Sequence, residues 1–182
     1  MIDLAAIILA GGRSQRMGQD KAGLRWDGQT AVARLAATAQ AVGAEAVRVS
    51  GGDYGLPFTR DPQAFGGPVG GILAAAADLP ASRRLLILAV DAPTVTPEDL
   101  APLLNAPAPG AAYARLPLPM VVWREAMPWR LPANSPIRRL IADTGLAELP
   151  APESALTRLR GANTPDEVEL LRHSGLSVEA PA

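Results

Sequence analysis

The sequence contains no cysteine and only one histidine, His173, among its 182 residues. Without cysteine the chain can form no disulfide, carry no thiolate nucleophile and bind no zinc through sulfur. One histidine likewise rules out a metal site built from several imidazoles. Any metal must therefore be held by oxygen ligands, which favours Mg²⁺ or a similarly hard cation. His173 falls beside Arg172 in the last expected helix, and we give it no catalytic role.

The sequence also lacks an excess of either charge and any long apolar run. Its 17 Lys and Arg residues and 18 Asp and Glu residues give a formal net charge of -1, so no overall positive field attracts DNA, RNA or an anionic membrane. No apolar run approaches the ~18 residues of a membrane-spanning helix. The opening MIDLAAIILAGG lacks the basic start and cleavage site of a signal peptide. We therefore expect a cytoplasmic location, with no nucleic-acid and no membrane partner.

Apolar residues, by contrast, are plentiful. Hydrophobic residues make up 48% of the chain and charged residues 19%, which is typical of a packed globular protein. A chain of this length suits one domain with its own core, and the sequence has no internal repeat and no clear linker. We expect a single domain over residues 1–182.

Short apolar runs predict the strands of this domain. Residues 5–10 (AAIILA), 46–50 (AVRVS) and 84–90 (RLLILAV) are the expected strands of the first half, the first of them buried on both faces. Helical patterns at residues 30–44 and 68–79 supply the strand–helix alternation of parallel crossover units. The expected fold is therefore α/β, a Rossmann-like three-layer sandwich with a mostly parallel, doubly wound sheet.

Residues that cap helices mark where the predicted helices begin. Proline is dense after residue 105, so regularity drops there, but a strand at residues 119–123 (PMVVW) and two further helices, SPIRRLIAD and NTPDEVELLRH, can still be traced. A short helix, TPEDLAPLL, precedes them. The expected N-cap residues are Thr30, Thr96, Ser135 (with Pro136 in the first helical position), and Asn163 or Thr164.

The stretch LAGGRSQRMGQDK directly follows the first expected strand. Ligands of open α/β sheets bind beyond the carboxyl ends of the strands, so this loop lies where chemistry is expected. It lacks the spacing of a P-loop and of a dinucleotide-binding GxGxxG motif, and on composition alone a solvated surface loop is an equal alternative. Its exposed N–H groups and cations nevertheless suit a polyphosphate; they come from Gly11, Gly12, Arg13, Arg16 and Lys21.

The longer stretch LAGGRSQRMGQDKAGL resembles the signature of the nucleotidyltransferases that build molybdenum cofactor dinucleotides, specifically the molybdenum cofactor guanylyltransferases. Gly-Gly, Arg-Met-Gly and Asp-Lys occur in the family's order and at its spacing after the first strand. Relatives that transfer cytidylyl groups usually carry Leu-Ala-Ala-Gly here, so Gly12 favours guanylyl transfer.

A second segment, TRDPQAFGGPVGGILAA, is similar to the family's aspartate followed by a Gly-Pro-Leu-x-Gly segment that opens a helix. The resemblance implies that Asp61 reads the guanine. A carboxylate suits that role because it can accept hydrogen bonds from the guanine N1–H and exocyclic amine together. The alternative is an aspartate that only starts a turn at Arg-Asp-Pro.

A third segment, LILAVDAPTVTPEDL, resembles the family's aspartate that follows a buried strand and binds Mg²⁺. The resemblance therefore implies that Asp91 holds the metal. One carboxylate at a strand end can occupy one Mg²⁺ position and leave the others to phosphate oxygens and water. The alternative is an aspartate that caps a helix or a turn.

Carried over position by position, the family's site gives a defined set of residues. The nucleotide-binding residues implied are Leu9, Ala10, Gly11, Gly12, Lys21, Ser50, Asp61 and Asp91, and the catalytic residues implied are Arg16, Lys21 and Asp91. Ser50 departs from the family, which commonly has Asn there, so a side-chain contact with the nucleotide could be shorter or lost. Later, LPLPMVVW is similar to the strand before the pterin-facing part, and RGANTPDEV matches part of the family's Asn-x-Asn-Thr-Pro-Glu ending.

The activity that the resemblance implies is Mg²⁺-dependent transfer of GMP from GTP to the terminal phosphate of molybdopterin, giving molybdopterin guanine dinucleotide and pyrophosphate. Residues 1–105 are then the nucleotide-binding half and residues 106–182 the acceptor-binding half. Implied protein partners are a molybdenum-insertion protein or molybdoenzyme chaperones. Two alternatives stay open: a related nucleotidyltransferase that uses CTP or another phosphorylated acceptor, and a non-catalytic protein that binds nucleotides.

Some candidates are set aside at this stage. Trp26, Trp123 and Trp129 could stack on a pterin, but aromatic residues near strands more often pack in the core or at its rim. Arg138 and Arg139 could reach a phosphate, but a solvated helix face accounts for them better.

Overall fold

The computed structural model describes residues 1–11, 21–61, 67–162, 164–172 and 178–179. They form a central sheet of seven strands in the order β5-β4-β1-β6-β8-β7-β9. Strand β8 is antiparallel to both of its neighbours, and every other neighbouring pair is parallel. The strands are β1 (Ile2–Leu9), β4 (Ala46–Ser50), β5 (Phe58–Thr59), β6 (Ser82–Ala89), β7 (Gly110–Tyr113), β8 (Leu116–Trp123) and β9 (Ala147–Leu149).

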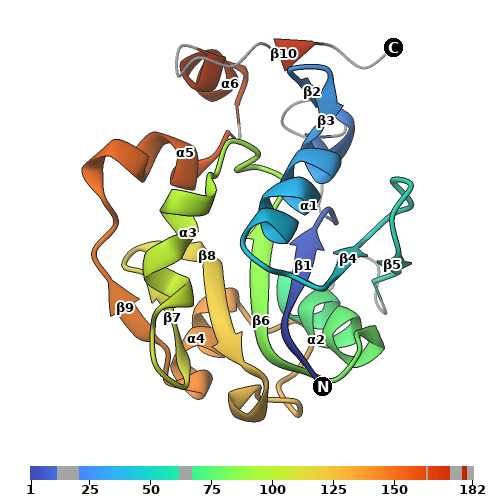
Figure 1. Cartoon of the computed structure of the whole chain (residues 1–182), viewed down its shortest axis with the longest axis vertical. Helices are drawn as coiled ribbons and strands as arrows, with labels where there is room; N and C mark the ends of the chain where they lie inside the picture. The colour runs from blue at the N-terminus through green and yellow to red at the C-terminus, as the bar shows by residue number, and fades with distance from the viewer. Residues whose placement is uncertain (12–20, 62–66, 163, 173–177, 180–182) are drawn as a thin grey trace.

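Helices cover both faces of this sheet, which confirms the predicted three layers (Figure 1). One face packs against α1 (Ala31–Ala41), α3 (Pro97–Leu104) and α5 (Leu156–Arg160), and the other against α2 (Pro68–Asp78) and α4 (Ile137–Thr144). The sequence of β1 is continuously apolar because both faces of the strand are buried. Leu4, Ala6 and Ile8 point into the first core layer, whereas Ala5, Ile7 and Leu9 point into the second.

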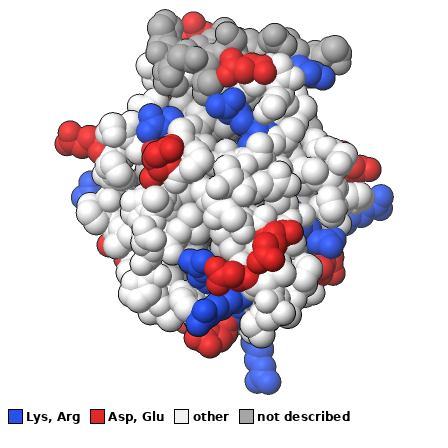
Figure 2. Space-filling view, viewed as in Figure 1, with Lys and Arg blue, Asp and Glu red and all other residues white. Residues whose placement is uncertain are grey.

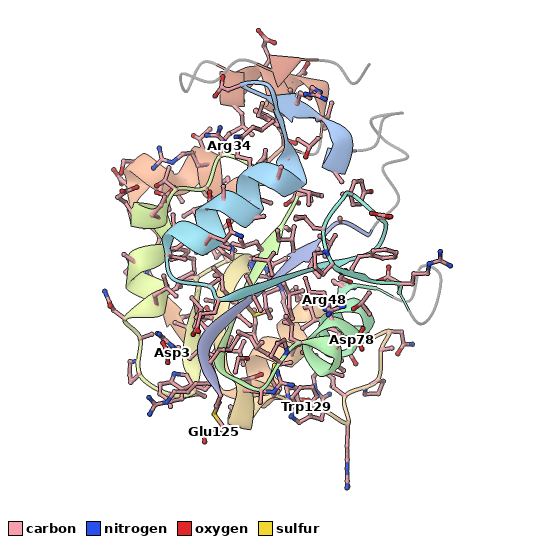
Figure 3. The ribbon with its side chains drawn as sticks, turned by 45° about the vertical axis from the view of Figure 1, so that its right-hand side comes forward. Asp3, Arg34, Arg48, Asp78, Glu125 and Trp129 are labelled. Carbon is pink, nitrogen blue, oxygen red and sulfur yellow. The ribbon has the colours of Figure 1, made fainter. Side chains whose placement is uncertain are left out.

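The strands of the first half lie where the apolar runs predict them, with shifted ends. β1 starts three residues before the predicted residues 5–10, because parallel pairing with β6 already begins at Ile2. β6 starts earlier than the predicted residues 84–90 for the same reason, at Ser82. β4 matches the prediction. Strand β5 forms the edge of the sheet beyond β4. Arg48 of β4 forms an ion pair with Asp78 of α2, and the two side chains lie side by side in Figure 3.

The caps of three helices follow the prediction and one does not. Thr30 accepts a hydrogen bond from Ala33 N at the start of α1, and Thr96 forms a capping box with Asp99 at the start of α3. At α6 (Pro165–Arg172) Thr164 and Glu167 exchange the same pair of bonds. The expectation for α4 was wrong. Pro136 has extended backbone angles, so the helix begins at Ile137 with no side-chain cap, and Ser135 N donates instead to Pro132 O.

A small second sheet, not predicted from the sequence, is separate from the main one. Its strands are β10 (Val178–Glu179), β2 (Arg25–Trp26) and β3 (Gln29–Thr30). Two-residue strands carry no periodic pattern, so sequence reasoning could not find them. Trp26 is only 1% exposed and packs against Leu24, Val168 and Leu171, which confirms it as a core residue. Figure 1 shows this sheet and α6 beyond the end of the main sheet to which β1 points.

The proline-rich segment is more regular than expected in its first part. It contains β7 and β8, and β8 is longer than the predicted residues 119–123. Beyond the 3-10 turn η3 (Arg124–Ala126) the chain crosses the start of α2, where Gly70 N donates to Ala133 O at 3.0 Å. A Cβ atom on Gly70 would lie 2.9 Å from the Ala133 Cβ, so the glycine lets the two segments touch. In the described part of the chain, every helix is too short or too polar to span a bilayer.

Candidate active site

Three neighbouring parallel strands end level with one another. Leu9 of β1 lies beside Ser50 of β4 on one side and Ala89 of β6 on the other. Pairing continues for one residue past the strand ends, since Ala10 N donates to Ser50 O at 2.8 Å and Val90 N donates to Leu9 O at 3.1 Å. The loops that follow these strands therefore leave the same edge of the sheet, where ligands of open α/β sheets bind.

A carboxylate and a hydroxyl meet at this edge on the β4 side of β1. Ser50, only 2% exposed, donates its Oγ proton to Asp61 Oδ1 at 3.1 Å. Asp61 lies in the loop after β5, two residues past Thr59, and is partly exposed. The buried hydroxyl therefore holds one oxygen of the Asp61 carboxylate, while the other oxygen, Oδ2, lies against Gly11.

Glycines make room for this carboxylate. A Cβ atom on Gly11 would lie 2.5 Å from Asp61 Oδ2, and one on Gly71 of α2 would lie 2.8 Å from Asp61 Oδ1 and overlap Ser50 Oγ. Gly51 has a φ of +131°, and a Cβ there would lie 2.7 Å from Gly11 N. Side chains at these three glycine positions would displace the carboxylate or the loop after β1. We call Gly11, Ser50, Asp61 and Gly71 the carboxylate cluster.

On the prediction from the sequence that this cluster binds a nucleotide, we expect Gly71→Ala to weaken that binding more than it weakens the fold. The added methyl has to push Ser50 and Asp61 apart, and overpacking of this kind costs about 1–3 kcal/mol. Chemical unfolding and a GTP titration of the variant measure the two effects. Ala74→Gly, elsewhere on α2 and partly exposed, makes the opposite change of helix propensity away from the cluster and so shows how much propensity alone affects GTP binding. A Gly71→Ala protein that binds GTP like the parent would contradict the role of the cluster.

A second group forms on the β6 side of β1. Lys21 Nζ donates to Ala162 O at 3.0 Å, and Ala162 N donates to Asp91 O at 2.6 Å. Gly161 has a φ of +67° and packs so closely on the Asp91 peptide that a Cβ atom would overlap Asp91 O. Lys21, Asp91, Gly161 and Ala162 thus form a cation–carboxylate cluster, built from the start, the middle and the end of the chain.

Burial raises the pKa of the Asp91 carboxyl above its usual value. The nearby Lys21 ammonium opposes that rise, as do hydrogen bonds from the N–H groups of Asp91 and Ala92, whereas Glu167 adds to it. The contacts that the protein makes with the charged carboxylate therefore do not fully offset the cost of burying it. A cation that arrives with a ligand would supply the missing compensation.

The donors at this edge fit a metal that is shared with phosphate. The described residues contain no group of three or more His, Cys, Asp or Glu side chains that could enclose a metal ion. Mg²⁺ is usually held by one or two carboxylates together with substrate phosphates and water rather than by an all-protein cage. A single, partly buried Asp91 carboxylate beside a lysine meets that requirement.

The structure brings most of the expected site residues to one edge. Leu9, Ala10 and Gly11 line it with backbone, Ser50 and Asp61 stand on one side of β1, and Lys21 and Asp91 are associated with the other. The structure adds that the Ser50 hydroxyl donates to Asp61, and the contact of Ser50 with a nucleotide stays a prediction. Gly12, Arg13, Arg16, Asn163 and His173 lie outside the described residues.

Three participants were missed by sequence reasoning. Gly71 was seen only as part of a helix, and Gly161 and Ala162 only as the part of RGANTPDEV that departs from the family pattern. For Gly71 the available signal was the pair of glycines inside a helical pattern, which points to close packing. No local pattern could indicate that Ala162 bonds to both Lys21 and Asp91, since those contacts span 141 and 71 residues.

Of the residues set aside from the sequence, Trp26 packs in the same core cluster as Ala162, whereas Trp123, Trp129 and Arg139 have other partners. Arg34 Nε donates to Pro93 O, two residues after Asp91, and Figure 3 shows Arg34 and Trp129 toward opposite ends of the molecule. Trp129 is stacked by Arg124 at 5.2 Å and Trp123 by Arg83 at 4.9 Å. Arg139 pairs with Asp143 on the exposed surface of α4. On the face drawn in Figure 2, basic and acidic side chains are interspersed.

An open, mostly parallel sheet with a carboxylate, a lysine and glycine-rich loops at its carboxyl edge defines an α/β protein of the nucleotidyltransferase fold. The model of the MobA-like NTP transferase domain matches residues 6–156. A molybdenum cofactor guanylyltransferase of Rhodobacter capsulatus is 38% identical over 141 residues, which cover 71% of this chain and 73% of that protein. The chain therefore belongs to the MobA-like NTP transferase family, as the sequence motifs predict.

Other relatives agree. A molybdenum cofactor guanylyltransferase of Xanthomonas euvesicatoria is 37% identical over 98 residues, covering 54% of this chain and 52% of that protein. The chain thus matches about half the length of this relative. Among solved structures, a nucleotidyl transferase from Methanothermobacter superposes with a TM-score of 0.71 at 17% identity, covering 94% of this chain and 97% of the other. A molybdopterin-guanine dinucleotide biosynthesis protein A from Archaeoglobus fulgidus gives 0.62 at 16%, covering 93% and 97%.

Proposed function

We propose that this protein transfers GMP from GTP to the terminal phosphate of molybdopterin, giving molybdopterin guanine dinucleotide and pyrophosphate. The observation that carries the proposal is the pair of clusters on the two sides of β1. One offers a positioned carboxylate and the other a lysine with a second carboxylate. The relatives named molybdenum cofactor guanylyltransferase support the choice of base and acceptor.

The carboxylate cluster is the proposed guanine site. Guanine presents two adjacent donors, N1–H and the exocyclic amine, and a carboxylate has acceptor capacity for both. Because Ser50 already donates to Asp61 Oδ1, that oxygen keeps one further lone pair, and Oδ2 keeps its own. The missing side chain of Gly11 leaves room for Asp61 Oδ2 at this edge. Backbone groups of Leu9, Ala10 and Gly11 complete the proposed base contacts.

The cation–carboxylate cluster is the proposed triphosphate site. Asp91 would hold Mg²⁺, which supplies charge neutralisation for the phosphates when it is bound. Lys21 brings a positive charge to the same place, and Arg16, which lies outside the described residues, is predicted to bring another. Together these residues neutralise charge and hold the phosphates in position, and they make no covalent bond.

The proposed reaction is an in-line displacement at phosphorus. A terminal phosphate oxygen of molybdopterin attacks the α-phosphorus of GTP and forms a new P–O bond, while the bond from that phosphorus to the bridging oxygen breaks and pyrophosphate leaves with its electron pair. Lys21 and Arg16 stabilise the oxygens that gain negative charge. No covalent enzyme intermediate is required.

The division of labour along the chain belongs to the same proposal. Residues 1–105 bind the nucleotide, and residues 106–182 bind the acceptor, except that Ala162 reaches back to the phosphate side. A molybdenum-insertion protein or molybdoenzyme chaperones are the proposed protein partners, with a cytoplasmic location. CTP and other phosphorylated acceptors are the competing substrates, and the carboxylate that faces the edge at Asp61 favours GTP over CTP.

Thermal unfolding with GTP, CTP, ATP and UTP, each with and without Mg²⁺, tests the base preference directly. A ligand at a hundred times its dissociation constant adds about 2.7 kcal/mol of stability. We expect a Mg²⁺-dependent rise in Tm with GTP and smaller rises with the other three. A larger rise with CTP would point to cytidylyl transfer, and binding of GTP without pyrophosphate release in the presence of molybdopterin would point to a non-catalytic nucleotide-binding protein.

A further inference from the structure

An ion pair beside the cation–carboxylate cluster joins two helices. Arg158 of α5 donates from Nε to Asp99 Oδ2 at 2.8 Å and from Nη2 to Asp99 Oδ1 at 2.7 Å. Asp99 is only 4% exposed. Its Oδ2 also accepts from Thr96 N at 3.0 Å, and its backbone oxygen accepts from Tyr113 Oη at 2.6 Å. One residue of α3 therefore connects that helix to α5 and to β7.

Both members of this pair are charged at neutral pH. Burial by itself raises the pKa of the Asp99 carboxyl, but the hydrogen bonds from Arg158 and Thr96 outweigh burial and hold that pKa below its usual value. The hydrogen bond with Asp99 raises the pKa of Arg158. A bidentate arginine–carboxylate contact with one buried partner is among the stronger and more directional contacts a protein makes.

The chain that follows Arg158 touches the proposed triphosphate site. Helix α5 is five residues long and ends at Arg160, so contacts with its surroundings must hold it in place. Gly161 and Ala162 come next. Gly161 packs on the Asp91 peptide, and Ala162 donates its N–H to Asp91 O and accepts a hydrogen bond from Lys21 at its own carbonyl oxygen. A displacement of α5 would move the contacts of Lys21 and Asp91 at once.

The same ion pair holds the far end of the Asp91 loop. That loop runs from Asp91 to Thr96, the N-cap of α3. Ala162 N fixes its first residue, and the Asp99 carboxylate fixes its last by accepting from Thr96 N. The Arg158–Asp99 ion pair is thus connected to both ends of the loop that carries the proposed metal-binding carboxylate, to one end through Asp99 and to the other through the residues that follow α5.

We propose that Arg158 is a positioning residue for nucleotidyl transfer: through Asp99 it fixes the Gly161–Ala162 turn, which in turn sets Lys21 and Asp91 relative to each other. The inference rests on the proposed function. Arg158 itself binds Asp99 with its guanidinium and acts through that contact. Small misplacements of groups that hold a reacting phosphate cost a large part of the rate, up to about a hundredfold for 1 Å.

The test compares Arg158→Gln with Arg158→Lys and Arg139→Gln. Arg139 is a matched control, because it also pairs with a carboxylate, Asp143, but on the exposed surface of α4. We expect Arg158→Gln to lower kcat by about ten- to a hundredfold with a smaller change in KM for GTP. Lysine keeps the charge but not the bidentate contact, so Arg158→Lys should recover part of kcat. Arg139→Gln should match the parent.

Hydrogen exchange at the Ala162 amide supplies a readout that needs no turnover. In the free protein this N–H is bonded to Asp91 O, so we expect Arg158→Gln to speed its exchange selectively, while amides in the middle of β6 keep their protection. A variant with parental kcat, or with an unchanged Ala162 amide, would overturn the positioning role. If the parent protein itself fails to transfer GMP, the proposed function fails, and the exchange result still decides whether Arg158 fixes the turn.

Discussion

Asp91→Asn is expected to lower the rate of GMP transfer by about 10²–10³-fold, the loss typical of removing one preorganised electrostatic contact from a transition state. Asparagine has nearly the shape of aspartate but no negative charge, so it should preserve the loop after β6 while losing the proposed Mg²⁺ ligand. Pyrophosphate release at saturating GTP, measured over a range of Mg²⁺ concentrations, gives the effect. Turnover close to that of the parent would contradict the assignment of Asp91.

The same substitution should make the free protein more stable at neutral pH. Burial raises the pKa of the Asp91 carboxyl in the folded protein above its usual 3.8. The stability that its proton contributes is fully present below the unfolded pKa and is lost as the pH rises through the folded pKa. Asparagine stays neutral at every pH in this range and so does not suffer the cost of a buried charge. The gain from Asp91→Asn is therefore absent in acid and complete at pH values above the raised pKa.

Unfolding curves of Asp91→Asn and of the parent, recorded without nucleotide or Mg²⁺ from acidic to neutral pH, measure this effect. Asp143→Asn is a suitable control, because Asp143 lies on α4 and its carboxylate accepts hydrogen bonds from the exposed Arg139. A lower neutral Tm for Asp91→Asn than for the parent would show that the carboxylate has a structural role instead.

Asp61→Asn is expected to raise the KM for GTP by about a hundredfold or more and to leave the weak binding of ATP nearly unchanged. The variant keeps one acceptor oxygen, but its amide NH₂ faces a donor of guanine rather than accepting from it. Hydrogen bonds to charged groups are worth about 1.5–3 kcal/mol each, and every 1.4 kcal/mol is tenfold in affinity.

The ratio of kcat/KM for GTP to that for ATP measures this discrimination. Asp53→Asn serves as the control, because Asp53 is an exposed aspartate of the loop after β4 whose Oδ1 accepts from Gly55 N. An equal loss with GTP and with ATP would mean that Asp61 maintains the loop and does not read the base. Unchanged discrimination would exclude the carboxylate cluster as the guanine site.

Much of the structure of residues 1–105 was predictable, because its signals are local. The apolar run of β1 ends at glycines, and the run of β6 ends just before Asp91, so both strand ends can be located within a residue or two. Thr30 and Thr96 mark helix starts through hydrogen bonds to residues three positions away. Parallel strands bring their carboxyl ends to one edge, so the residues after them share a site.

The contacts that complete the site were not predictable, because they join distant parts of the chain. Arg158 and Asp99 are 59 residues apart, and Ala162 meets Lys21 across 141 residues. The pair of glycines at Gly71 points to close packing, but no local pattern identifies Ser50 and Asp61 as the side chains that fill the space. Ser50 illustrates the same limit: its departure from the family's asparagine was visible in the sequence, but its bond to Asp61 became visible only in the structure.

The most direct measurement is a transfer assay in which the protein, Mg²⁺ and molybdopterin receive GTP labelled at its α-phosphate, together with an equal concentration of CTP. The account predicts that the label moves to the pterin, that one pyrophosphate appears for each GTP consumed, and that no cytidylyl product accumulates. Preferential use of CTP, or pyrophosphate release that does not depend on the pterin, would contradict guanylyl transfer to molybdopterin as the function of this site.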